Sequence, residues 1–357
     1  MTVNEIDQQK AEVFAEKMIG ILNSGALALM SSIGHRTQLF DVMSELPPST
    51  SEQIAMAARL KERYVREWLG AMVTGGIVEY DPDHGTYRLP PEHASSLIRE
   101  AAPDNIAVFA QYIPLMGTVE DKIVECFKKG GGVPYSDFGR FHEVMAEDSG
   151  QTVVAALMDS ILYLVPGLVE DLKRGIDVLD VGCGSGRALN LMARHFPESR
   201  FTGYDISQQA IAMGRTEAEQ QGITNLRFEV KDVTALDASL QYALITAFDA
   251  IHDQAQPDRV LQGIATALHA NGTFLMQDIA ASSQVHKNID HPVGPLLYTL
   301  SCMHCMTVSL ASNGAGLGAM WGEEMARKML KEAGFTKVEI KKLPHDFQNI
   351  YYIIKTN

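Results

Sequence analysis

An aspartate and three glycines at alternate positions form the most distinctive chemical pattern in the chain. Asp180 is the penultimate residue of the largely apolar run 176–181, Gly182, Gly184 and Gly186 follow this run, and helix-forming residues come directly after them. An apolar run flanked by glycines predicts a buried strand that turns directly into a helix. Glycines at such a turn let a ligand approach the backbone closely, and the N–H groups at the helix start attract its anionic part. The pattern predicts a site for a nucleotide-type ligand; the alternative is an ordinary strand-to-helix turn.

The glycine spacing excludes the dinucleotide-binding fingerprint G-x-G-x-x-G. Arg187 stands where the third glycine would fall if the count began at Gly182, and Leu189 stands there if it began at Gly184. The pattern present, D-x-G-x-G-x-G, resembles the first motif of class I S-adenosylmethionine-dependent methyltransferases. This resemblance implies S-adenosylmethionine as the cofactor.

Further acidic residues follow the next predicted strands. Asp205 ends the second strand about 20 residues past the glycines, where a carboxylate can accept hydrogen bonds from both ribose hydroxyls. The resemblance places Asp232 beside the adenine and implies that Asp180 orients the turn or binds the methionine amino group. One strand-end aspartate alone is usually a turn or cap residue, so the prediction depends on all three. The predicted cofactor-binding residues are Asp180, Gly182, Gly184, Gly186, Asp205, Ile206, Asp232, Val233 and Phe248.

A histidine and an aspartate, His252 and Asp253, directly follow the fourth predicted strand. They resemble the histidine–aspartate pair of the small-molecule O-methyltransferases, in which the histidine is the general base, a role that suits its near-neutral pKa. We therefore predict His252 as the base and Asp253 as the residue that holds its imidazole. Direct pairing requires a turn, because neighbours in an extended segment point in opposite directions; the alternative is a loop histidine before a helix. Gln254 replaces the tryptophan of the plant-type enzymes, which leaves the acceptor open.

The segment 281–320 has the length of a lid or substrate wall. It contains Cys302, His304 and Cys305, whose side chains can bind zinc, but no second C-x-x-C accompanies them. A packed amphipathic helix is the favoured interpretation, so no metal site is predicted, and His304 is a candidate polar contact for a substrate. The predicted substrate-contacting residues are Tyr112, Tyr163, His304 and Trp321, with a place in the core or a dimer interface as the alternative for each tyrosine.

Strand-like and helix-like segments alternate from about residue 175, which predicts a parallel sheet covered by helices on both faces. The predicted strands are 176–181, 200–206, 226–230, 243–251, 272–279, 338–343 and 350–355. The predicted helices between them are 187–196, 208–221, 257–269 and 322–333. In open α/β sheets, ligands bind at the carboxyl ends of the strands, where the polar residues above lie. The pattern resembles the Rossmann-like, seven-stranded methyltransferase sheet, whose last strand is antiparallel.

The first 100 residues predict an α-helical winged-helix domain. Its helices are 37–44, 51–58 and 61–74, followed by a hairpin with strands 77–80 and 86–89. Such a domain raises an alternative of another class, a DNA-binding regulator whose second half senses a ligand. Charge opposes it: residues 1–100 contain nine Lys/Arg and fourteen Asp/Glu, whereas a DNA reader shows a basic face. Nucleic acid is therefore not a predicted partner.

Taken whole, the chain resembles a bacterial and invertebrate family of winged-helix-plus-methyltransferase proteins related to the small-molecule O-methyltransferases. The glycine motif, 248–254 and the region from 303–306 to 320–322 carry this resemblance. It implies methyl transfer to a small molecule, with an oxygen or nitrogen nucleophile favoured and a thiol S-methyltransferase as the alternative. It also implies a homodimer, because related enzymes dimerise through this module. The expected domains are 1–100 (winged helix), 101–173 (helical connector lining the active site) and 174–357 (methyltransferase domain with lid 281–320).

Composition agrees with a globular protein of two domains, since the chain has 357 residues, 46% of them hydrophobic and 21% charged. A net charge of −14 opposes non-specific binding to nucleic acid or anionic membranes. We see no signal-peptide pattern and no apolar run of roughly 18 residues, so no membrane is a predicted partner. Four cysteines do not suggest a disulfide framework, and the predicted location is cytoplasmic.

Overall fold

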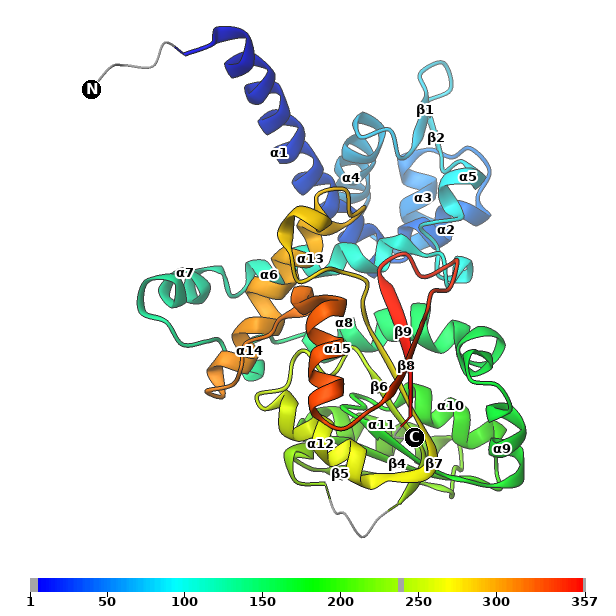
Figure 1. Ribbon diagram of the computed structural model, residues 1–357. Helices are drawn as coiled ribbons and strands as arrows, with labels where there is room; N and C mark the ends of the chain where they lie inside the picture. Colours follow the sequence, from blue (N-terminus) through cyan, green and yellow to red (C-terminus); the bar gives the residue numbers. More distant parts are fainter. Residues whose placement is uncertain (1–5, 237–240, 356–357) are drawn as a thin grey trace. The chain divides into compact units, whose positions relative to one another are not determined.

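The computed structural model describes residues 6–236 and 241–355, and the chain divides into two compact units, Met1–Pro114 and Leu115–Asn357 (Figure 1). The predicted connector 101–173 is not a unit of its own. Its residues up to Pro114 belong to the first unit, and the rest belong to the second.

The first unit contains the helices and the hairpin of a winged-helix domain. Helices α2 (Leu39–Glu45), α3 (Ser51–Ala58) and α4 (Glu62–Thr74) precede strands β1 (Glu79–Asp81) and β2 (Thr86–Arg88), which pair antiparallel. Helix α3 begins with a capping box between Thr50 and Gln53. The fully buried side chains include Phe40, Trp68 and Leu69, so the apolar residues of α2 and α4 form the core of this unit.

Helix α1 (Gln8–Arg36), which was not predicted, is long, apolar and mostly exposed. Among its residues only Ser32, Gly34 and His35 are buried. Its 18-residue window of mean hydropathy 1.3 makes it long and apolar enough to cross a membrane, which corrects the expectation that no stretch of this kind exists. Core helices and signal sequences pass the same test of length and composition, so no membrane assignment follows.

The second unit is built on a seven-stranded sheet with the order β5-β4-β3-β6-β7-β9-β8. Its strands are β3 (Asp177–Val181), β4 (Arg200–Asp205), β5 (Leu226–Val230), β6 (Tyr242–Phe248), β7 (Leu268–Ile279), β8 (Lys337–Lys341) and β9 (Asn349–Lys355). Strand β9 runs antiparallel to β7 and β8, and the other neighbours are parallel. The predicted seven-stranded sheet with an antiparallel last strand is confirmed.

Alternate residues of the strands point to opposite faces of the sheet and form two hydrophobic cores. Val178 and Leu244 pack with α9 (Leu168–Arg174), α10 (Arg187–His195) and α11 (Gln208–Gln220). Leu179 and Ile245 pack on the other face with α12 (Pro257–Ala267) and α15 (Gly322–Glu332). The near-continuous apolar strands thus follow from burial on both faces.

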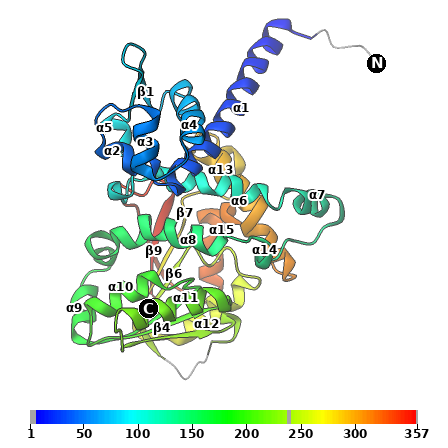
Figure 2. The same cartoon turned by 180° about the vertical axis from the view of Figure 1, so that it is seen from behind.

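Two further helical segments of this unit contain π-helical turns. Helix α8 (Phe141–Ser149) continues into the π segments Gly150–Val154 and Leu157–Ile161, and Ser301–Cys305 is a π segment between α13 (Gly294–Leu300) and α14 (Met306–Ala311). Helix α8 lies over the starts of α10 and α11 (Figure 2), where Arg187 donates a hydrogen bond to the carbonyl of Ala146. Helix α8 therefore covers the carboxyl edge of the sheet.

Candidate active site

The glycine turn after β3 requires glycine at each of its three positions. Gly182, Gly184 and Gly186 have φ of +71°, +55° and +67°, a backbone region that favours glycine. A Cβ at Gly186 would lie 2.2 Å from the ring of Phe228, whereas a Cβ at Gly184 would meet no atom within 4 Å. The turn is therefore tightly packed beneath α10 and open at Gly184, as a ligand cradle must be.

Asp205, at the end of β4, faces this open part of the turn. Its Oδ2 accepts a hydrogen bond from the Gly184 N–H (2.8 Å), and its Oδ1 accepts one from the Ser207 N–H (2.7 Å). Burial raises the pKa of Asp205 against the effect of these hydrogen bonds. Each carboxylate oxygen keeps a second lone pair, so Asp205 can still accept hydrogen bonds from two hydroxyls. His142 of α8 contacts Ser207 (Nε2 to Oγ, 3.0 Å); no sequence pattern pointed to this histidine.

Asp180, at the end of β3, is a buried carboxyl beside the same turn. The hydroxyl of Thr246 in β6 donates to its Oδ1 at 2.7 Å. Burial raises the pKa of Asp180 from 3.8 to about 7. A positively charged ligand group next to it would offset that burial, because an opposite charge favours the ionised form.

The other predicted cofactor residues lie at the same edge of the sheet, after β4, β5 or at the end of β6. Asp232 accepts a hydrogen bond from the Thr234 N–H (2.9 Å) and thereby caps a short helical turn. Val233 is buried in the core, and Ile206 is 70% exposed. Phe248 is the last residue of β6. Their placement agrees with the predicted edge, and their individual roles stay predictions.

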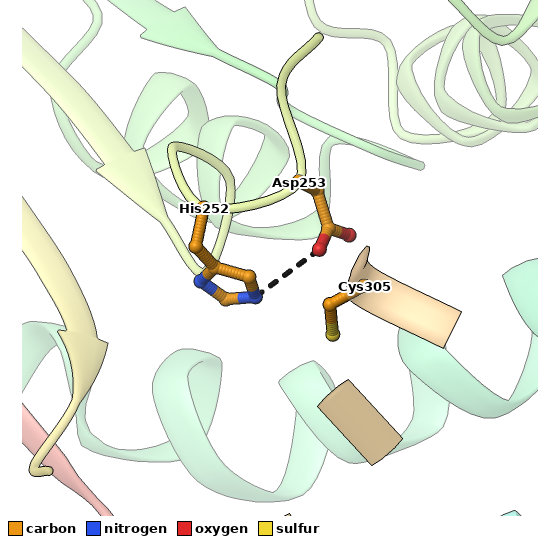
Figure 3. A group of neighbouring side chains, drawn as sticks. All are labelled: His252, Asp253 and Cys305. Carbon is orange, nitrogen blue, oxygen red and sulfur yellow. Dashed lines mark ion pairs between the residues drawn. The ribbon is translucent and has the colours of Figure 1, made fainter. Parts of the chain in front are cut away.

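His252 lies in the turn that direct pairing with Asp253 requires. Strand β6 ends at Phe248, earlier than the predicted residue 251, and Asp249 has a φ of +50°. The chain turns over residues 251–253, which brings Nε2 of His252 to 3.2 Å from Oδ1 of Asp253 (Figure 3). The two side chains therefore form an ion pair.

Asp278, at the carboxyl end of β7, holds the other side of His252. Its Oδ1 lies 2.8 Å from His252 Nδ1 and accepts a hydrogen bond from Trp321 Nε1 (3.0 Å). Sequence reasoning missed Asp278, although an acid at the end of the fifth predicted strand was the available signal. Trp321, predicted to contact substrate, is buried, and its indole N–H positions Asp278; its contact with substrate stays a prediction.

The two carboxylates decide the charge of His252. Burial alone would lower its pKa, but the nearby carboxylates of Asp278 and Asp253 outweigh burial and raise it well above 6.5. For Asp253, burial by itself would raise the pKa. Its contact with His252 outweighs burial and brings the pKa of Asp253 below the ordinary value. The contact thus favours a protonated His252 beside an ionised Asp253.

His304 lies on the other side of Asp253 in a box of aromatic rings. Its ring stacks on Phe141 (centroids 3.6 Å apart), and Tyr135 and Phe138 contact it edge-on. Its Nδ1 lies 3.9 Å from Asp253 Oδ2, which also accepts a hydrogen bond from the Tyr135 hydroxyl (2.8 Å). Burial lowers the pKa of His304 to about 4. The structure thus places a neutral histidine next to the His252–Asp253 pair.

The two tyrosines predicted to contact substrate differ in exposure, and their contact with substrate stays a prediction. Tyr163 is 62% exposed. Tyr112 is buried and belongs to the first unit. Cys305, in contrast, lies against His252 and Asp253 (Figure 3), which the favoured interpretation of a simply packed helix did not include.

Comparisons with known proteins find a match for a stretch of each unit. Residues 25–99 match the family described as "Rv2258c-like winged HTH domain", and residues 172–334 match the family described as "Methyltransferase domain". A ubiquinone biosynthesis O-methyltransferase of Coxiella burnetii is 29% identical over 107 residues, 30% of this chain. That match spans 44% of the relative's length, less than half of it.

Solved structures share the fold over nearly the whole chain. Human N-acetylserotonin methyltransferase, in complex with S-adenosylmethionine, has a TM-score of 0.67 and 15% identity, and the match covers 100% of both chains. An O-methyltransferase family protein from Burkholderia thailandensis has a TM-score of 0.67 and 13% identity, and the match covers 96% of this chain and 98% of that one. The predicted fold, a winged-helix domain followed by a class I methyltransferase domain, is confirmed.

Proposed function

We propose that this chain, in which a winged helix-turn-helix domain precedes a methyltransferase domain, transfers a methyl group from S-adenosylmethionine to an oxygen or nitrogen atom of a small molecule. One observation carries the proposal: the glycine turn and the His252 turn are in contact. A Cβ at Gly182 would lie 2.6 Å from Cβ of Ala250, two residues before His252. A cofactor held by the first turn would therefore react beside the second.

The residues present fit S-adenosylmethionine. Asp205 would accept hydrogen bonds from the ribose hydroxyls of the cofactor, and Asp180 would bind its methionine ammonium group. Burial raises the pKa of Asp180, and the positive charge of the ammonium group would favour its ionised form. Asp232 and Val233 would contact the adenine, with Gly184 leaving space for the cofactor beside the backbone. When bound, the cofactor supplies a methyl group on a positively charged sulfur.

His252 is the proposed proton acceptor for the nucleophile. Asp278 holds Nδ1–H and so directs Nε2 away from β7 toward Asp253. Since the pKa of His252 is raised, Nε2 must first lose its proton, and the base-competent fraction grows as pH rises. The acceptor would take the place next to Nε2 that Asp253 now occupies, with the neutral His304 as a polar contact nearby.

The assembly and location remain predictions of the same proposal. We expect a homodimer and a cytoplasmic protein. The ligand-sensing regulator is not favoured, because residues 1–100 carry more acidic than basic side chains and DNA binding depends on positive charge.

The test is transfer of a labelled methyl group from S-adenosylmethionine into a small-molecule cell extract. Wild type should give labelled product. His252→Ala should lower turnover by about 10²- to 10⁴-fold, the usual contribution of a general base, while cofactor affinity stays unchanged. Asp205→Ala should weaken cofactor binding, and His195→Ala, an exposed histidine at the end of α10, is the matched control. Absence of cofactor binding by wild type would refute the proposal. Full turnover by His252→Ala would exclude His252 as the general base.

A further inference from the structure

We propose that His252, Asp253 and Cys305 form a binding site for a soft or borderline divalent cation such as Zn²⁺. His252 Nε2, a carboxylate oxygen of Asp253 and Cys305 Sγ would be its ligands. The site itself does not depend on the proposed transferase activity, but its effect on turnover rests on that activity.

The three side chains come from two distant segments and lie next to one another (Figure 3). His252 and Asp253 lie in the turn after β6, and Cys305 ends the π segment before α14. One ligand atom from each lies within 4.8 Å of the other two, and His252 and Cys305 are buried. Imidazole, thiolate and carboxylate are the ligands that zinc binds in proteins, and three protein ligands leave one tetrahedral position open.

The contact between His252 and Asp253 leaves a place for a positive charge. Nε2 and Oδ1 are 3.2 Å apart, yet within the described part of the chain Oδ1 makes no hydrogen bond of good geometry. The two atoms are therefore close without being aligned as donor and acceptor. Once Nε2 has released its proton, while Nδ1 keeps the hydrogen that Asp278 accepts, Nε2 and Oδ1 both present lone pairs. A cation bound by both atoms and by the neighbouring sulfur satisfies them together.

The surroundings of the three ligands match those of metal sites in proteins. A metal-bound histidine almost always donates its other ring N–H to a carboxylate or a carbonyl, and ligating carboxylates are themselves hydrogen-bonded. Here Asp278 accepts from Nδ1 of His252, and the Tyr135 hydroxyl donates to the second oxygen of Asp253. Trp321 in turn fixes Asp278. Hydrogen bonds thus already orient His252 and Asp253, the two ligands from the turn after β6, and also Asp278 behind them.

Cation binding and proton transfer would use the same nitrogen. Binding releases the thiol proton of Cys305 and, where His252 is protonated, the proton on Nε2, while Nδ1–H stays with Asp278. The Nε2 lone pair that holds the cation is then unable to take a proton from an acceptor. Loading with Zn²⁺ would therefore inhibit turnover that depends on His252, and a chelator would restore it.

The test uses chelator-treated, full-length protein titrated with Co²⁺ and Zn²⁺ without cofactor or acceptor. Wild type should bind one ion and show the thiolate-to-cobalt charge-transfer band. Cys305→Ser should lose this band, and His252→Ala should weaken binding as well. Asp278→Asn should weaken binding by about 10- to 100-fold, as loss of a second-sphere partner does. Cys302→Ser is the matched control, because Cys302 lies in the same π segment outside the ligand group.

Two results would overturn the site: no Co²⁺ or Zn²⁺ binding by wild type, or an unchanged charge-transfer band in Cys305→Ser. Binding of S-adenosylmethionine, measured for each protein, checks that the variants are folded. It also separates the two proposals, because a protein that binds cofactor but no cation refutes only the cation site. A protein that binds the cation but still transfers no methyl group after a chelator has removed the cation refutes only the transferase.

Discussion

Replacing Asp278 by asparagine removes one charge from the site and keeps the shape of the side chain. Asp278 is fully buried, and its Oδ1 is shared by His252 Nδ1, Trp321 Nε1 and the Ile279 N–H. An asparagine oxygen can still accept these hydrogen bonds, but it no longer favours the imidazolium. We expect the pKa of His252 to fall and its orientation to become less well defined.

The size of the effect follows from the contact that changes. A hydrogen bond to a charged group contributes about 1.5–3 kcal/mol, and each 1.36 kcal/mol in the activation barrier is a factor of ten in rate. If the interaction stabilises the transition state in full, turnover falls by about 10- to 150-fold. The pH–rate profile should also change. Its rising limb should shift to lower pH, because His252 loses its proton more readily in the variant.

The assay is methyl transfer at saturating cofactor across the pH range, with cofactor affinity measured beside it. Affinity should not change, since Asp278 is not among the residues expected to hold the cofactor. Asp177→Asn is the matched control: this aspartate lies at the opposite end of β3 in an exposed ion pair with Arg200. A profile and a maximal rate equal to those of wild type would refute the role assigned to Asp278.

Two further predictions concern the cofactor turn. Gly186→Ala should reduce the free energy of unfolding in urea by about 1–3 kcal/mol more than Gly222→Ala, because both have φ near +66° but only a Cβ at Gly186 meets a ring; equal losses would contradict the packing argument. Since burial raises the pKa of Asp180 from 3.8 to about 7, its ionisation should lower stability as pH rises between these values. Cofactor binding at pH 6 should then release a proton, detected by calorimetry in several buffers, and Asp180→Asn should abolish the release.

The cofactor half of the site was predictable because its residues follow one another along the chain. The glycine turn and the alternation of strands and helices depend on local patterns of apolar residues and glycines, and the structure confirms the seven-stranded sheet. Asp278 and the contact of Cys305 with His252 were missed, because these residues meet His252 only through pairing of β6 with β7 and packing of the π segment. Helix α1 was missed for a different reason: its apolar residues are not confined to one face, so no helical period marked it.

The π segment Ser301–Cys305 has a consequence for how such a site can change during evolution. A π turn holds one residue more than an α turn, and in an α-helix one residue corresponds to a rotation of about 100°. Deleting a single codon here would restore an α-helix and change which residues of this segment face His252. His304 and Cys305 would then keep their chemical identity but face different neighbours. A single insertion or deletion can thus create or abolish the contact with His252 while every other side chain in the chain stays the same.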